Sequence, residues 1–250
     1  MGLDIKLKKK LHDFLDKKFK SKISSFKRPT TLDKNFAAIH TIPEKDRRMY
    51  SGVASLLTSF GQNFYEEIAV LIASENSDIA KTQFKSNLMV SKDRTSTINE
   101  ITRQLVNKTR KPNRIKEMNE ILSVPNRNLV EVNDAQLVDV YIKQGNKEYY
   151  FELKTVLGNV RGQRSHKDQI LKWVSRENRD IHVALVYPYN PYHPEPYKRH
   201  GSNDLFELGE DLLVGEAFWD LIGGKNTYED IQDAFKTIGT KYWEKLSAKF

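Results

Sequence analysis

The stretch of residues 136–155 constrains the fold of this 250-residue chain more than any other part of it. Two β-prone runs flank the dipeptide Gly145-Asn146, and a glycine in the first position suits a type II′ hairpin turn. If these two residues are the loop, Gln144 pairs with Lys147, and every other pair of the hairpin follows from that one. The sequence therefore predicts an antiparallel hairpin with a defined register.

This register gathers charge on one face of the hairpin. It sets Asp139 directly opposite Glu152, with the two Cβ atoms roughly 4.5–5.5 Å apart. Lys154 shares the face of Glu152 because side chains alternate along a strand, whereas Phe151 and Leu153 point the other way. Facing carboxylates repel each other unless a cation lies between them, and oxygen ligands of this kind suit Mg²⁺. We therefore expect a magnesium site here, and the alternative is an ordinary amphipathic hairpin with a solvated polar face.

Composition narrows the choice of partners. The net charge of +8 and the isoelectric point of about 9.3 favour a polyanion, nucleic acid first, and the alternative is a basic soluble protein without such a partner. There are no cysteines, which excludes disulfides, thiolate zinc sites and a cysteine nucleophile. No apolar run reaches the length of a membrane span, and the first residues lack the apolar core of a signal peptide. We expect a cytoplasmic protein that does not use a membrane.

The segments before the hairpin are interpreted from their periodicity. Residues 1–28 hold ten Lys or Arg and a helical apolar stripe, so this helix docks on the core, contacts phosphates or lies on a membrane. A second, longer helical pattern covers residues 51–73. Residues 74–131 are polar and basic, with helical signals near 98–106 and 115–122, and such a positive segment suits sequence-independent phosphate contact.

After the hairpin the pattern alternates between helix and strand. We expect a helix from Ser165 to Arg176 and a buried strand at Ile181–Tyr187, which together imply a right-handed parallel crossover. Three further helices are predicted at 207–222, 228–238 and 241–250, separated by glycines.

The charged face and the order of elements carry a resemblance. Asp139 followed by Glu152-Leu153-Lys154 resembles the PD-(D/E)xK motif of the restriction-endonuclease superfamily, without the proline that names it. The order helix, hairpin, helix, strand is similar to the αβββαβ core of that superfamily. The resemblance implies an α/β fold in which a mixed sheet is flanked by helices, with helical additions at both ends. For the remaining core strand, Leu129–Val132 is a candidate.

A narrower resemblance, to type II restriction endonucleases of the TdeIII type, covers roughly residues 50–240. It rests on the segments Phe151–Thr155, Tyr189–Tyr192 and Leu213–Gly224, the last followed by Thr227-Tyr228. It implies a nuclease domain at 49–250, preceded by a basic helical extension at 1–48. Within that domain we expect a basic helical insert near 76–128 and a helical part at 205–250.

The superfamily resemblance also assigns roles. It implies that Asp139 and Glu152 hold Mg²⁺, together with the backbone carbonyl of Leu153. Lys154 would orient the attacking water or stabilise the charge that develops on the phosphate. A glutamate of the first core helix often reaches the same site; the resemblance favours Glu66, while helical geometry equally permits Glu67.

Members of the similar family read short G/C palindromes interrupted by one free base, of the GGNCC kind. Arginine is the usual bidentate reader of guanine, and both arginine and lysine contact phosphates. The candidates for contact with DNA are Arg161, Arg164, Lys167, Lys198 and Arg199.

The function expected from this resemblance is magnesium-dependent cleavage of double-stranded DNA by a type II restriction endonuclease, leaving a 5′-phosphate. A palindrome presents two strands related by a two-fold axis, so a homodimer is expected, with a DNA methyltransferase as genetic partner. The alternatives are a structure-specific or repair nuclease on the same core and a non-catalytic DNA-binding protein. A membrane-surface protein that uses its basic N-terminal helix is a further alternative.

Overall fold

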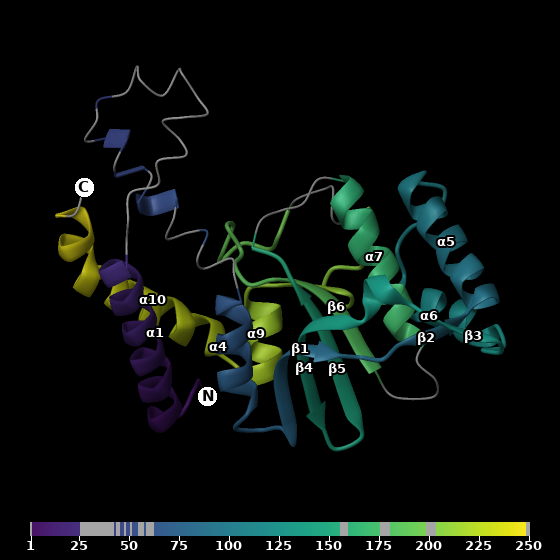
Figure 1. Ribbon diagram of the computed structural model, residues 1–250, viewed down its shortest axis with the longest axis horizontal. Coiled ribbons are helices and arrows are strands. Elements are labelled where there is room, and N and C mark those ends of the chain that lie inside the picture. The colour runs from purple at the N-terminus through teal and green to yellow at the C-terminus, as the bar shows by residue number, and fades with distance from the viewer. Residues whose placement is uncertain are drawn as a thin grey trace. The chain divides into compact units, whose positions relative to one another are not determined.

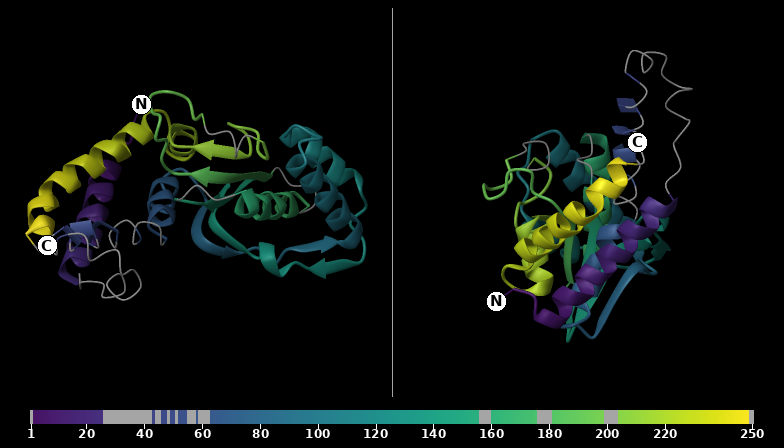
Figure 2. Two further views of the ribbon diagram at one scale, coloured as in Figure 1. Left: turned by 90° about the horizontal axis from the view of Figure 1, so that it is seen from above. Right: turned by 90° about the vertical axis from the view of Figure 1, so that its left-hand side faces the viewer.

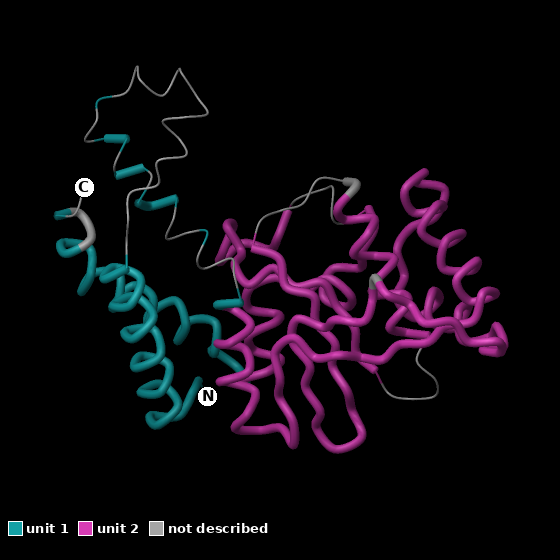
Figure 3. The backbone as a smooth tube through the Cα atoms, in the orientation of Figure 1, with its two compact units in different colours: residues 1–64, 224–250 teal, residues 65–223 magenta. Residues whose placement is uncertain are grey.

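The computed structural model describes residues 2–25, 43, 46–47, 49–50, 52–54, 58, 63–155, 160–175, 181–198 and 204–248. By its contacts the chain divides into two compact units, one made of Met1–Phe64 with Gly224–Phe250 and one made of Tyr65–Gly223 (Figure 3). The smaller unit groups the C-terminal helix with the N-terminal helix, and the division expected at residue 48 stays a prediction.

The described helices and strands appear in Figure 1. In chain order they are α1 (Ile5–Ser25), α4 (Phe64–Ala73), β1 (Ile79–Lys85), β2 (Met89–Ser91), α5 (Lys92–Val106), α6 (Arg114–Ser123), β3 (Leu129–Glu131), η2 (Asn133–Ala135), β4 (Leu137–Gln144), β5 (Lys147–Leu153), α7 (Val160–Val174), β6 (Ile181–Tyr187), β7 (Leu212–Val214), α9 (Glu216–Gly223) and α10 (Thr227–Ser247).

The smaller unit pairs α1 with α10. Every fourth residue of α1 from Leu7 to Ile23 is buried, and Phe19 stacks on Tyr242 of α10 with ring centroids 6.2 Å apart. The apolar stripe of the N-terminal helix therefore packs against α10 within the smaller unit, and its docking on the core stays a prediction. The prediction of separate helices at 228–238 and 241–250 is wrong, since α10 continues through Gly239 without a break.

The larger unit is built on a five-stranded sheet in the order β1-β4-β5-β6-β7. The β1–β4 and β4–β5 pairs are antiparallel, and the β5–β6 and β6–β7 pairs are parallel, so the mixed sheet expected from the sequence is confirmed. The parallel crossover from β5 through α7 to β6 is confirmed as well. One of the three predicted C-terminal helices is replaced by a strand and a shorter helix, β7 and α9.

The hairpin register is confirmed. Gln144 pairs with Lys147, and the ladder continues to the pair Val140 and Phe151, one step before the two acidic residues. Gly145 has a φ of 58°, which the first position of a type II′ turn needs and which glycine adopts without a steric cost. Local turn chemistry and side-chain alternation thus place the strands that carry the site.

The remaining core strand is β1, and the candidate at Leu129–Val132 is wrong. β3 pairs with β2 in a separate two-stranded sheet, whereas β1 pairs with β4 at one edge of the main sheet. β1 falls inside the segment that was expected to be a basic helical insert. Its burial does not alternate, although in its sequence Lys81, Gln83 and Lys85 alternate with Ala80, Thr82 and Phe84.

Helices cover both faces of the sheet. Tyr150 of β5 meets Trp173 of α7 edge to face, while the next residue, Phe151, meets Phe218 of α9 on the opposite face. α5 and α6 pack on α7, which therefore lies between the sheet and these two helices (Figure 2). α7 begins at Val160 and not at Ser165, so part of the glycine- and arginine-rich segment before it is helical.

Candidate active site

Three predicted side chains converge where the β4–β5 hairpin opens. The Nζ atom of Lys154 lies 2.5 Å from Oε1 of Glu152 and 3.7 Å from Oδ2 of Asp139. The N–H of Leu153 donates to Oδ2 of Asp139 at 2.9 Å, so this carboxylate takes over a backbone donor just beyond the last ladder pair. The ammonium supplies the positive charge that two neighbouring carboxylates require.

The fourth predicted residue, Glu66, reaches the same place through a residue that the sequence did not suggest. Gln83 of β1 donates from Nε2 to Oε2 of Glu66 at 2.7 Å and to Oδ1 of Asp139 at 3.3 Å. Glu66 is buried, with 7% of its surface exposed, whereas the side chain of Glu67 is only half-buried. Of the two glutamates left open by helical geometry, the structure brings Glu66 to the site.

Helix α7 contributes two further side chains. Gln169 donates from Nε2 to Oε2 of Glu152 at 3.0 Å, and Nδ1 of His166 lies 3.6 Å from Oε1 of the same carboxylate. The two residues lie one helical turn apart on the same face of α7, as residues three apart do. Glu152 is thus held between Lys154, which directly follows the end of β5, and the covering helix.

Crowding of acidic groups shifts their proton affinities. Burial raises the pKa of Glu66 to about 7; the hydrogen bond from Gln83 opposes this shift and the charge of Asp139 adds to it. Burial also raises the pKa of Glu152, and the neighbouring Asp139 reinforces the shift. Burial lowers the pKa of Lys154, but its acidic neighbours outweigh that effect and the net shift is upward. Lys154 is therefore charged at neutral pH.

The pKa of His166 is shifted downward. Burial lowers its pKa, and the positive charge of Lys154 adds to the effect. The imidazole is accordingly neutral beside the charged ammonium at neutral pH, so it adds no second positive charge to the site.

One residue predicted to contact DNA does not lie at the surface. Lys167 is completely buried, with Nζ 2.7 Å from Oε2 of Glu117 and in contact with Oδ2 of Asp211. The remaining oxygens of these carboxylates accept backbone N–H groups of Asn113 and Glu207. Such a closed ion cluster holds α6, α7 and the turn before β7 together, and the assignment of Lys167 to DNA is wrong.

The other predicted DNA contacts are exposed or lie outside what the structure describes. Arg164 is exposed on α7 beside a hollow that Ser165 and Asp168 also line. Lys198 is exposed and pairs with Glu195 at 3.2 Å. The backbone of Arg161 belongs to α7, but its side chain and the whole of Arg199 are outside the described residues.

Sequence reasoning missed Gln83, His166 and Gln169. Gln83 lies on a strand that periodicity did not reveal, and its role depends on pairing with β4. His166 and Gln169 are three positions apart and share one face of the predicted helix, but no sequence pattern indicated that this face meets the hairpin.

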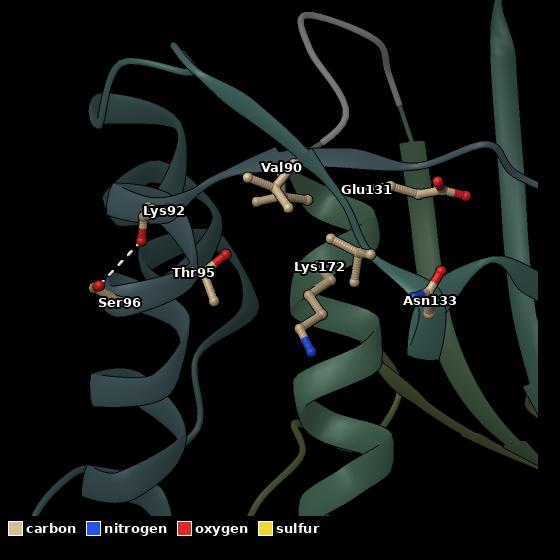
Figure 4. A pocket seen from close by; sticks show the side chains of 9 residues that line it. Val90, Lys92, Thr95, Ser96, Glu131, Asn133 and Lys172 are labelled. Atoms are coloured by element: carbon tan, nitrogen blue, oxygen red, sulfur yellow. Dashed lines mark hydrogen bonds between the residues drawn. The ribbon is translucent and has the colours of Figure 1, made fainter.

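A larger hollow lies elsewhere in this unit. It has a volume of about 580 Å³ and lies between β2, β3, the start of α5 and Lys172 of α7 (Figure 4). Val90, Val130 and Val132 line it together with polar side chains, and none of the converging site residues takes part. In the part of the chain that the structure describes, no three His, Asp or Glu side chains are grouped so as to hold a metal ion by themselves. No described helix is long and apolar enough to cross a membrane.

The donor set nevertheless suits a hard divalent cation. Mg²⁺ keeps several waters and is bound in proteins by one or two carboxylates, so a third carboxylate is not required. Asp139 and Glu152 provide two, on adjacent strands of a mixed sheet flanked by helices. The mixed five-stranded sheet flanked by helices is consistent with a restriction-endonuclease-like fold.

The family model described as "Type II restriction endonuclease, HinfI" matches residues 3–239. The chain belongs to this family. The family model does not name the TdeIII type, so that narrower resemblance stays a proposal.

Curated relatives agree with the family. The type II restriction enzyme MjaII of Methanocaldococcus jannaschii is 28% identical over 200 residues, which are 73% of this chain and 53% of that enzyme. The type II restriction enzymes HgiEI and HgiBI of Herpetosiphon aurantiacus are 24% identical over 208 residues and 22% identical over 249 residues. Those two alignments cover 79% and 95% of this chain, and 74% and 87% of the respective enzymes. The chain thus spans about half the length of MjaII, and no solved structure matches it.

Proposed function

We propose that this chain hydrolyses phosphodiester bonds in both strands of a specific DNA sequence with Mg²⁺ as cofactor. The observation that carries the proposal is the convergence of Lys154 with Asp139 and Glu152 at the open end of the hairpin. Membership of a type II restriction endonuclease family supports it.

In this proposal Asp139, Glu152 and the carbonyl of Leu153 hold the ion. The ion, when bound, polarises the scissile phosphate and lowers the pKa of a water molecule. Lys154 keeps a positive charge beside the two carboxylates, with 34% of its side chain exposed, so its ammonium is available to negative charge that develops on the phosphate. Gln169 fixes one oxygen of Glu152, which limits the directions in which the other oxygen can point.

The proposed substrate is a short G/C palindrome interrupted by one free base, of the GGNCC kind, in keeping with the TdeIII-type segments. Arg164 and Lys198 are exposed and available for DNA contact. A homodimer would place one site on each strand, because a palindrome has two-fold symmetry. A DNA methyltransferase encoded nearby would protect the host from such an enzyme.

Digestion of a defined plasmid tests the proposal. With Mg²⁺ the wild-type chain should give discrete, reproducible bands whose ends carry 5′-phosphates, and chelation with EDTA should abolish them. Asp139→Asn should abolish cleavage, while Glu131→Gln, which removes an exposed carboxylate on β3, should leave it intact.

A smear of products, or nicks confined to junctions and flaps, would replace the proposal with the structure-specific nuclease. Tight DNA binding without cleavage under any divalent ion would favour the non-catalytic alternative.

A further inference from the structure

Gln83 has a backbone conformation that its residue type disfavours. Its φ is 50°, in the left-handed region where a side chain with a Cβ atom is strained. The other described non-glycine residues with positive φ are four asparagines and Lys108, and each of them lies outside the strands and helices. Gln83 is in the interior of β1. Such a conformation persists only where the surroundings enforce it, and such sites concentrate where function needs them.

The conformation interrupts the side-chain alternation of β1. Thr82 pairs with Val140 and Phe84 with Val138, so Gln83 stands opposite Asp139. The amide of Gln83 contacts Asp139, and the neighbouring Phe84 stacks on Tyr141, with ring centroids 4.1 Å apart, on the same face. In a regular strand these two neighbours would point to opposite faces. The left-handed residue therefore lets one strand supply both a polar group to the site and an aromatic ring to the core.

The amide of Gln83 uses both of its N–H groups on carboxylates. One goes to Glu66 on α4 and the other to Asp139 on β4, two elements that meet at the edge strand β1 (Figure 1). A neutral donor between two acids lowers their mutual repulsion without adding charge. The length of the side chain then fixes how far apart the two carboxylates stand.

We propose that Gln83 is a positioning residue of the nuclease site, whose amide sets the separation at which Glu66 and Asp139 face the metal ion. The inference rests on the proposed function and names a residue through which a third carboxylate is tied to that site. Outer contacts of this kind change metal affinity or activity by about 10- to 100-fold when they are removed.

Two substitutions separate the effect of the left-handed backbone of Gln83 from the effect of its hydrogen bonds to Glu66 and Asp139. Gln83→Asn suits the left-handed φ better than glutamine, since asparagine is enriched there, but its shorter side chain cannot span both carboxylates. Gln83→Glu keeps the length and the strained backbone and removes the donor. Lys108→Asn is the matched control, because Lys108 has a φ of 58° and is exposed in an ion pair with Asp204.

The measurements are the Mg²⁺ concentration for half-maximal cleavage, kcat and KM for a cognate duplex, Tb³⁺ luminescence titration and the melting temperature without metal. We expect Gln83→Asn to melt at or above the wild-type temperature, and we expect the same of Lys108→Asn. It should nevertheless need about 10-fold more Mg²⁺ and bind Tb³⁺ more weakly, with KM unchanged. Gln83→Glu should melt lower without metal and gain more stability from Mg²⁺ than the wild type does.

Wild-type ion affinity and wild-type kcat in Gln83→Asn would overturn the inference while leaving the proposed function intact. A fall in melting temperature for Gln83→Asn, with ion affinity unchanged, would assign the amide to folding alone and would also overturn it. If the wild-type chain cleaves no DNA, the proposed function fails, and the Tb³⁺ titration of the variants still decides whether Gln83 positions the carboxylates.

Discussion

The larger unit contains two clusters of the same composition, one lysine between two carboxylates, and their surroundings differ. In one, Lys154 meets Asp139 and Glu152 at the open end of a hairpin, and 34% of the lysine side chain is exposed. In the other, Lys167 meets Glu117 and Asp211 with no exposed surface on the lysine. The first cluster is open to solvent, and the second is closed to it.

The difference lies in how the carboxylate oxygens are satisfied. In the closed cluster, backbone N–H groups complete the shells of Glu117 and Asp211, so the charges are fixed by groups that cannot leave. In the open cluster Asp139 also accepts a backbone N–H, that of Leu153, but the donors to Glu152 are the side chains of Lys154 and Gln169, which can rearrange around a ligand. The same three charges thus stabilise the fold at one place and are available for chemistry at the other.

The largest effect is expected from a substitution that disrupts the closed cluster and lowers the free energy of unfolding. Lys167→Met leaves two buried carboxylates without their counter-ion, and removal of one partner from a buried ion pair costs about 3–5 kcal/mol. The midpoint of urea unfolding should fall accordingly, measured by circular dichroism with EDTA present. Lys154→Met is the matched control and should lower the midpoint much less. Equal losses for the two lysines would mean that the clusters do not differ in the way described.

The next largest effect is expected on kcat, from a substitution that disrupts the open cluster. Lys154→Ala should lower kcat by at least about 100-fold, the scale found when one preorganised donor to a developing negative charge is removed. The unfolding midpoint should change little, because the side chain is partly exposed. Single-turnover cleavage of a cognate duplex gives the rate. A rate within twofold of wild type would remove Lys154 from the site.

These two lysines also mark the limit of prediction from sequence. The hairpin register could be predicted because the Gly145 turn and the strand alternation are local, and the register alone brings Asp139, Glu152 and Lys154 together. Lys167 could not be placed, since its partners Glu117 and Asp211 are brought to it by tertiary folding. From the sequence it is one more basic residue next to a glycine- and arginine-rich segment.

Two strands of the main sheet, β1 and β7, were not predicted from the sequence for related reasons. β1 is an edge strand, and the alternation in its sequence from Ala80 to Lys85 includes one large apolar residue, Phe84, which makes a weak strand signal. β7 has three residues and is specified by parallel pairing with β6, which no local signal announces. In α10, Gly239 was taken as a break, but a glycine inside a helix costs only about 1 kcal/mol and packing of the helix offsets it.

A pH experiment sharpens the comparison. The pKa of Glu66 in the folded protein is about 7, above its ordinary value of 4.5. Between these two pH values the folded protein keeps a proton on Glu66 that the unfolded chain has released. The stability that this proton contributes is fully present below about pH 4.5 and is lost as pH rises through 7. The wild-type free energy of unfolding should therefore fall relative to that of Glu66→Gln over this window and run parallel above it.

Urea unfolding in EDTA from pH 5 to 8.5 measures this difference, with Glu67→Gln as the neighbouring control. A constant offset between wild type and Glu66→Gln across the window would contradict the shifted pKa.

The smallest effect concerns two basic residues three positions apart on α7. Arg164 is exposed while Lys167 is closed off, so only the arginine is available to DNA. Arg164→Ala should reduce the slope of log K against log salt by about one, as expected for the loss of one phosphate contact. Fluorescence anisotropy with Ca²⁺ in place of Mg²⁺ measures it. Arg103→Ala, which removes an exposed arginine paired with Glu100, should leave the slope unchanged.

Helix α7 is gripped from two sides, by the Lys167 cluster and by the contact of Gln169 with Glu152. It can neither slide nor turn about its axis without tearing one of these contacts. A duplex that contacts Arg164 would therefore meet a helix that is fixed in place. Any change of shape that recognition requires must then occur in the DNA or in the loops. In a co-crystal structure, a change in the DNA would be visible as distorted base steps.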